Sequence, residues 1–168
     1  MNRWLRILKH RLLDEGDARR ALGRGALERL QARVSASERA HSGEIRICVE
    51  AGLPLSYLWR GATARQRAVT MFGKLRVWDT EHNNGVLVYL LLAEHSIEIV
   101  ADRGLSRHVE AAQWQALTTH MAAAFKAGRY EEGLNAAVDA VSALLDQHFP
   151  VEGHAANPNE LPDAPVIQ

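Results

Sequence analysis

Polar side chains that could bind a cation or exchange protons occur at three separate points, each beside an apolar run. Five of them are candidate ligands: Glu44 before the first run, Asp79, Asn83 and Asn84 before the second, and Asp102 after the third. Carboxylate and amide oxygens are the ligands that hard divalent cations prefer. If the three points meet in space, these five residues form a site for Ca²⁺ or Mg²⁺.

Two neighbouring side chains extend the chemistry of this set. Arg103 follows Asp102, and His82 precedes the two asparagines. A guanidinium can stabilise the charge of a phosphoryl group, and a histidine can exchange protons near neutral pH. We expect Arg103 and His82 to contact a substrate or an anion. The pattern identifies no catalytic residue.

A second interpretation of the same residues involves no ligand. Asn-Asn-Gly at 83–85 tolerates the positive φ of a tight turn, and Asp-Arg-Gly at 102–104 can simply end a strand. Both interpretations stay open, because what favours a site is the convergence of three polar loops rather than any one of them.

The elements that must position these loops follow from hydrophobic periodicity. Residues 86–92 form the most apolar run of the chain, which predicts a central strand buried on both faces. Residues 44–50 alternate as a strand, and residues 62–78 follow the helical period between the two. This strand–helix–strand unit predicts parallel strands.

A short connection then leads to a third strand, 96–101, which predicts an antiparallel hairpin with the central strand. The first two strands therefore begin at the edge of the sheet where the third one ends. That edge receives all three polar loops. The opposite edge receives residues 52–54 and 93–95, which supply a single carboxylate.

The predicted fold class is α/β, a three-layer α/β/α sandwich on a small mixed sheet with two C-terminal helices. Helical stripes place those helices at 106–126 and 130–148. The boundaries are an α/β domain at 26–150, an N-terminal segment with a loose glycine-containing linker at 1–25, and an acidic, proline-containing disordered tail at 151–168.

Residues 3–13 predict a short basic amphipathic helix. Its apolar stripe consists of Trp4, Leu5, Leu8 and Leu12, and its cations are Arg3, Arg6, Lys9 and Arg11. One interpretation is a surface for anionic lipid or an acidic partner. The other is a first helix docked on the domain with its basic side chains in water.

Composition narrows the class of protein. Twenty Lys and Arg balance twenty Asp and Glu among 168 residues, so no global field attracts nucleic acid. The single cysteine, Cys48, excludes an internal disulfide and a cysteine-based zinc site. Neither an apolar run of about 18 residues nor a signal-peptide pattern is present. We expect a cytoplasmic protein, free or peripheral to a membrane.

Four short motifs, in order and at matching spacing, resemble the TPM domain family. They are Ser-Gly-Glu-Ile at 42–45, Asn-Asn-Gly-Val-Leu at 83–87, Ile-Glu-Ile at 97–99 with Gly-Leu at 104–105, and Phe-Lys-Ala-Gly-Arg-Tyr at 125–130. The resemblance covers about residues 38–149. It implies an α/β/α sandwich, divalent-metal binding (mainly calcium), acid phosphatase activity in some members, and roles in the assembly or repair of membrane complexes.

The sequence departs from the family pattern after the third strand. Members of the family usually show Gly-x-Gly-Leu-Glu there, followed by an Asp, where this chain has Asp102, Ser106 and Ala111 at the first Gly, the Glu and the Asp. Two acidic positions are lost and one is gained. We therefore expect a binding or assembly module for an unknown protein partner, with a metal-dependent phosphatase as the alternative.

Overall fold

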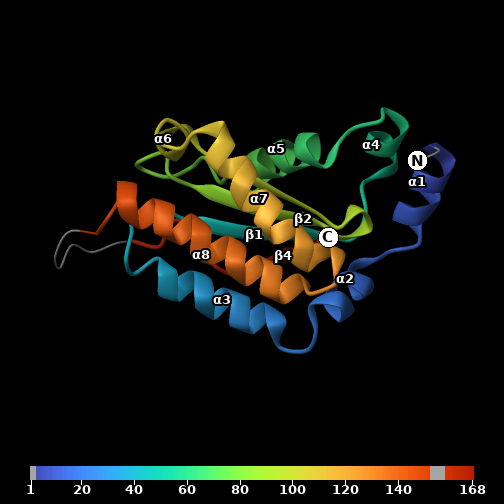
Figure 1. Ribbon diagram of the computed structural model, residues 1–168, viewed down its shortest axis with the longest axis horizontal. Coiled ribbons are helices and arrows are strands. Elements are labelled where there is room, and N and C mark those ends of the chain that lie inside the picture. Colours follow the sequence, from blue (N-terminus) through green and yellow to red (C-terminus); the bar gives the residue numbers. More distant parts are fainter. Residues whose placement is uncertain (1–2, 152–157) are drawn as a thin grey trace.

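A computed structural model describes residues 3–151 and 158–168 (Figure 1). Its sheet has the strand order β3-β2-β1-β4. The strands are β1 (Ile45–Glu50), β2 (Val86–Leu91), β3 (Ser96–Ala101) and β4 (Val166–Ile167). β1 runs parallel to both β2 and β4, whereas β3 runs antiparallel to β2. The predicted parallel pair and hairpin are both confirmed.

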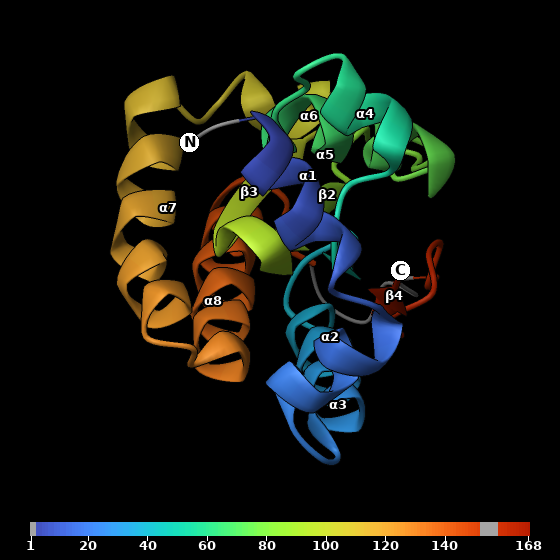
Figure 2. The same cartoon turned by 90° about the vertical axis from the view of Figure 1, so that its right-hand side faces the viewer.

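Helices cover both faces of the sheet (Figure 2). The helices are α1 (Arg3–Arg11), α2 (Glu15–Leu22), α3 (Ala26–Ser37), α4 (Leu55–Trp59), α5 (Ala64–Lys74), the 3₁₀ turn η1 (Leu92–Glu94), α6 (Arg103–Ser106), α7 (Ala111–Lys126) and α8 (Tyr130–His148). α2, α3, α7 and α8 cover one face, and α4 and α5 cover the other. The predicted α/β/α sandwich is confirmed.

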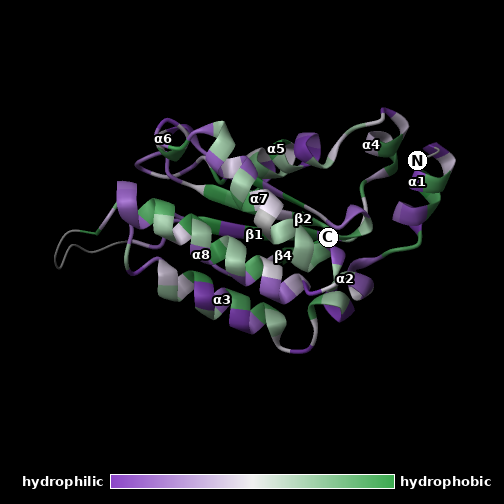
Figure 3. Cartoon of the chain, in the orientation of Figure 1, coloured by the Kyte–Doolittle hydropathy of each residue, from purple (hydrophilic) through white to green (hydrophobic). Residues whose placement is uncertain are grey.

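β2 is the centre of the core because every one of its residues is buried. Alternate side chains point to opposite faces of a strand. Val86, Val88 and Leu90 enter the larger apolar cluster under α3 and α8, while Leu87 and Tyr89 enter the smaller cluster under α5. Hydrophobic and hydrophilic colours alternate along α3 and α8 (Figure 3).

Two helix predictions were wrong. Residues 14–25, expected to be a loose linker, contain α2, which begins with a capping box between Asp14 and Asp17. The single helix expected at 106–126 is divided into α6 and α7, because Asp102 starts a short turn and Glu110 begins a new helix. In both cases, hydrogen bonds between a side chain and the nearby backbone set where the helices begin.

The expectation of a disordered tail is wrong for residues 158–168. Val166 and Ile167 pair with β1 as β4, and Leu161 is buried. Arg46 donates to the carbonyl oxygens of Pro162 and Ala164. The same prediction covered residues 152–157, which lie outside the described residues, and Val151, whose backbone N–H donates to the carbonyl of Ala40.

β1 is buried on both faces, although its sequence alternates between apolar and polar residues. Glu50 is 3 % exposed and accepts hydrogen bonds from Arg67 of α5 and from the hydroxyl of Tyr89 (2.6 Å). Arg67 donates to both carboxylate oxygens of Glu50. The polar face of β1 is thus buried together with its apolar face.

Truncating the centre of the core should be costly. Leu90→Ala removes a fully buried side chain and leaves a cavity, so the free energy of unfolding should fall by about 2–5 kcal/mol. Denaturant melts measure the loss. Val69→Ala, at a half-exposed position on α5, is the control and should change stability by less than about 0.5 kcal/mol. A Leu90→Ala loss below about 1 kcal/mol would contradict a central β2.

Candidate functional site

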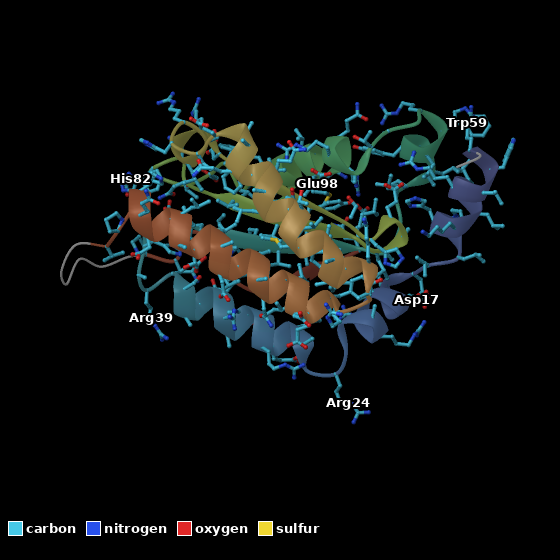
Figure 4. All side chains as sticks on the ribbon, in the orientation of Figure 1. Asp17, Arg24, Arg39, Trp59, His82 and Glu98 are labelled. Atoms are coloured by element: carbon cyan, nitrogen blue, oxygen red, sulfur yellow. The ribbon has the colours of Figure 1, made fainter. Side chains whose placement is uncertain are left out.

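The topology brings the three polar loops to one edge of the sheet. Ile45 pairs with Val86, and Val86 pairs with Ala101. Glu44 and Asp102, each the next residue outward, therefore lie at the same edge. We call the loops around residues 41–44, 79–85 and 102–104 the rim. His82 projects from this end of the molecule, and Trp59 from the opposite end (Figure 4).

Glu44 is already engaged by the protein. Its two carboxylate oxygens accept hydrogen bonds from the backbone amides of Glu160 (3.1 Å) and Leu161 (3.2 Å). Only 1 % of the residue is exposed, and burial raises the pKa of its carboxyl group. The observed role of Glu44 is to fix the segment that leads to β4.

Arg103 and Asn83 bond to each other at the outer side of the rim. The guanidinium donates from Nε (3.2 Å) and Nη2 (3.1 Å) to the side-chain oxygen of Asn83. Asp79 is more than half exposed and lies 3.9 Å from Arg76. His82 is exposed to solvent. These side chains therefore do not surround one point.

Two rim oxygens have no hydrogen-bond partner within the described residues, namely Oδ1 of Asn84 and Oδ2 of Asp102. The amide nitrogen of Asn84 donates to Ser42, on the β1 side of the rim. The other oxygen of Asp102 accepts the backbone N–H of Arg103 and caps α6. Buried oxygens rarely lack partners, so both atoms are candidates for contact with a ligand.

No group of three His, Cys, Asp or Glu side chains forms a metal-binding arrangement in residues 3–151 and 158–168. The five predicted ligands lie at the same edge of the sheet, but their side chains do not converge on one position where a cation could bind. As they stand, Asn84 and Asp102 can each supply one free oxygen, while Glu44 and Asn83 are occupied by protein donors.

Sequence reasoning missed a buried carboxyl group behind the rim. Glu38 caps the end of α3, and its Oε1 accepts the backbone N–H of Ile45 at 2.8 Å. Burial, opposed by that hydrogen bond, raises the pKa of Glu38 to about 8. A glutamate near a helix end is ordinarily solvated, so its type and position gave no signal of this environment.

A second candidate surface lies at the other end of the molecule, where α1 docks through polar side chains. Arg6 donates to Glu94 at 2.7 Å and to the carbonyl of Ala62 at 2.7 Å. His10, which is buried, contacts Glu94 at 3.0 Å and accepts the N–H of Leu53 at 3.0 Å. Of the four predicted surface cations, Arg6 thus faces inward, while Arg3, Lys9 and Arg11 are exposed.

The apolar stripe of α1 faces solvent and continues onto α4. We call the following six residues, each at least half exposed, the α1–α4 surface: Trp4, Leu5, Leu8, Leu12, Leu55 and Trp59. The rings of Trp4 and Trp59 meet edge to face at 6.2 Å. Arg3 lies 4.4 Å from the centre of the Trp59 ring, so a cation contacts this apolar area.

The family model described as the TPM domain matches residues 17–144, which is more than half of the chain. The chain belongs to the TPM domain family. The match contains the whole rim and the central strands. The resemblance in the four sequence motifs is thereby confirmed.

Two solved structures share this TPM fold. The BA42 protein of the psychrophilic bacterium Bizionia argentinensis is 23% identical, with a TM-score of 0.73, over 85% of this chain and 92% of that one. The N-terminal domain of a P. gingivalis protein is 21% identical, with a TM-score of 0.63, over 80% and 82%. Identities this low establish the fold alone. No curated protein matches the TPM chain.

Among the described residues of this TPM protein, no helix combines the length and the apolar character that crossing a bilayer requires.

The shifted carboxyl of Glu38 should make stability pH-dependent. Because its folded pKa of about 8 exceeds the ordinary 4.5, the folded state binds more protons between those values. The free energy of unfolding should therefore fall as pH rises through this range, by up to about 1.4 kcal/mol per pH unit from this group. Glu38→Gln keeps the acceptor for Ile45, and the slope should become shallower.

Denaturant melts at a series of pH values give the slopes. Glu28→Gln, an exposed position on the same helix, is the matched control and should keep the slope of the parent chain. Identical slopes for the parent and Glu38→Gln would contradict a protonated Glu38 in the folded protein.

Proposed function

We propose that this TPM domain is a binding module that docks on an anionic membrane surface through the α1–α4 surface. The observation that carries the proposal is the orientation of α1. An amphipathic helix normally buries its apolar stripe, whereas α1 docks through Arg6, Ile7 and His10 and leaves that stripe exposed.

The chemistry of the surface favours lipid over an apolar protein partner. Tryptophan and arginine are typical of the interface between acyl chains and headgroups, and Trp4, Trp59 and Arg3 form one contiguous group here. Residues 3–13 contain no acidic side chain. Exposed cations therefore accompany the apolar residues without an opposing charge on the same helix.

A short apolar helix alone binds membranes weakly, and stable attachment needs a second contribution. Here the second contribution is electrostatic, from Arg3, Lys9, Arg11 and Arg60, all of which are exposed. Each cation near an anionic surface adds about 1 kcal/mol. Binding through the α1–α4 surface should accordingly depend on anionic lipid and on salt.

A divalent cation at the rim is a second, separate part of the proposal. It is supported by the two buried oxygens without partners, on Asn84 and Asp102. Such a cation would draw these two loops together and so stiffen the rim for a protein partner. Catalysis by a metal-dependent phosphatase is the alternative, with Arg103 as the group that would stabilise phosphoryl charge. Phosphate-ester turnover with and without Ca²⁺ or Mg²⁺ separates the two.

Vesicle co-sedimentation tests the membrane proposal. The protein should pellet with vesicles that contain phosphatidylglycerol, and binding should fall as salt rises from about 0.05 M to about 0.5 M. Leu5→Glu should abolish binding because it charges the exposed stripe. Arg3→Glu should weaken it by about fivefold or more, since it reverses one interfacial charge.

Matched controls are available elsewhere on the chain. Val69→Glu charges an exposed apolar position on α5, and Lys74→Glu reverses an exposed cation, so both should bind vesicles like the parent. Equal binding to neutral phosphatidylcholine vesicles would overturn the electrostatic part. Concentration-dependent dimers that Leu5→Glu dissolves, without vesicle binding, would identify a second copy as the occupant.

A thermal melt tests the rim. If a cation binds there, millimolar Ca²⁺ or Mg²⁺ should stabilise the fold by mass action, by about 2.7 kcal/mol at one hundred times Kd. Asp102→Asn should reduce that gain, while its side-chain oxygen can still cap α6. Asp139→Asn on α8 is the control. A melt that neither cation moves would remove the metal from the proposal.

A further inference from the structure

A pocket of about 480 Å³ lies where α1 and α2 meet η1 and the start of α8. These segments come from distant parts of the chain and lie together at one end of the sheet (Figure 2). Its apolar wall consists of Leu12, Leu13, Ala21 and Leu92. The volume falls within the range of about 300–1,000 Å³ typical of small-molecule sites, which are mostly apolar with a few polar groups.

One cation at this pocket has no partner. Lys9 lines the pocket, and in the described part of the chain its amine makes no ion pair or hydrogen bond. The pocket also holds one carboxylate, Asp17, but that group accepts from Arg20 at 2.5 Å and from the backbone of Asp14. The uncompensated charge at the pocket is therefore positive.

The remaining wall is a rigid polar pair. The hydroxyl of Tyr130 lies 2.6 Å from Nδ1 of His95, and their rings stack at 5.9 Å. His95 holds a left-handed backbone conformation with φ 50°, which a non-glycine residue adopts at a cost. His95 and Tyr130, the first residue of α8, both line the pocket, so their contact joins the end of η1 to the start of α8 there.

We propose that this pocket binds a single-chain amphiphile with one carboxylate, of the fatty-acid class. Its aliphatic tail would lie against the leucine and alanine wall, and its carboxylate would pair with Lys9. A multiply charged phosphate ligand fits poorly, because among the residues that line the pocket Lys9 would have to balance its charge alone.

The proposal does not rest on membrane docking. The α1–α4 surface uses the outward stripe of α1, from Trp4 and Leu5 to Trp59, whereas the pocket lies on the side of α1 toward α2 and uses Lys9. Leu12 belongs to both. Lys9 also contributes to both, whereas Leu55 of the α1–α4 surface lies outside the pocket lining, so a variant at Leu55 can separate the two sites.

Calorimetric titration in solution, without vesicles and below the micellar concentration of each ligand, tests the site. Decanoate should bind, and affinity should rise by roughly fourfold per added methylene from octanoate until the tail fills the pocket. Lys9→Met should weaken decanoate binding by about tenfold, because it removes the charge but keeps the apolar stem. Binding of decanol should not change in that variant.

Two controls locate the site. Arg11→Met removes an exposed cation from the same end of the chain but outside the pocket lining, and it should leave decanoate binding intact. Ala21→Phe should fill the pocket and weaken both decanoate and decanol. Leu55→Glu charges the α1–α4 surface on α4, away from Lys9, and should weaken vesicle binding yet keep decanoate, which distinguishes this site from the membrane proposal.

Three results would overturn the proposal. The first is the absence of decanoate binding at millimolar concentration. The second is binding that Ala21→Phe leaves unchanged in a folded protein, which places the ligand elsewhere. The third is equal affinity for decanoate and for decyltrimethylammonium, which removes the role of Lys9.

Discussion

The structure depends on neutralising the charged face of β1. Glu44, Arg46 and Glu50 point to one side of a strand that is buried on both faces, and each buried charge is costly unless it is paired or hydrogen-bonded. Arg67 of α5 pairs with Glu50, the carbonyl oxygens of Pro162 and Ala164 accept from Nη1 of Arg46, and two backbone amides donate to Glu44. One face of one strand thus determines where α5 and the segment leading to β4 must lie.

The same constraint explains the rim. Glu44 has the type and position of a metal ligand, but the protein uses its oxygens to hold its own backbone. Asn83 is likewise used by Arg103. What remains available are single oxygens of Asn84 and Asp102. The ligands that this edge can bind therefore depend on how many of its side-chain oxygens already accept hydrogen bonds from the protein.

Sequence periodicity was sufficient for the central architecture, because β2 is apolar throughout and the turn at Asn83-Asn84-Gly85 fixes where it begins. Strand directions, and hence the shared edge of Glu44 and Asp102, followed from connection lengths. Periodicity did not predict the features that depend on single polar contacts. The capping box of α2, the inward turn of Arg6 and the pairing of β4 each depend on a partner far along the chain or on local side-chain geometry. The sequence pattern could not predict the pocket beside Lys9 for the same reason.

β4 contributes only two residues, yet it is one of the two outermost strands of the sheet. Beside it lies β1, whose backbone groups would otherwise offer a template for a foreign strand, and such templates promote aggregation or strand exchange. Gln168 continues this cover, since its backbone bonds to Val49 and Ala51. The short C-terminal segment thus protects the sheet against intermolecular pairing. Proteolysis behind Leu161 would therefore change the solubility of this domain rather than only its length.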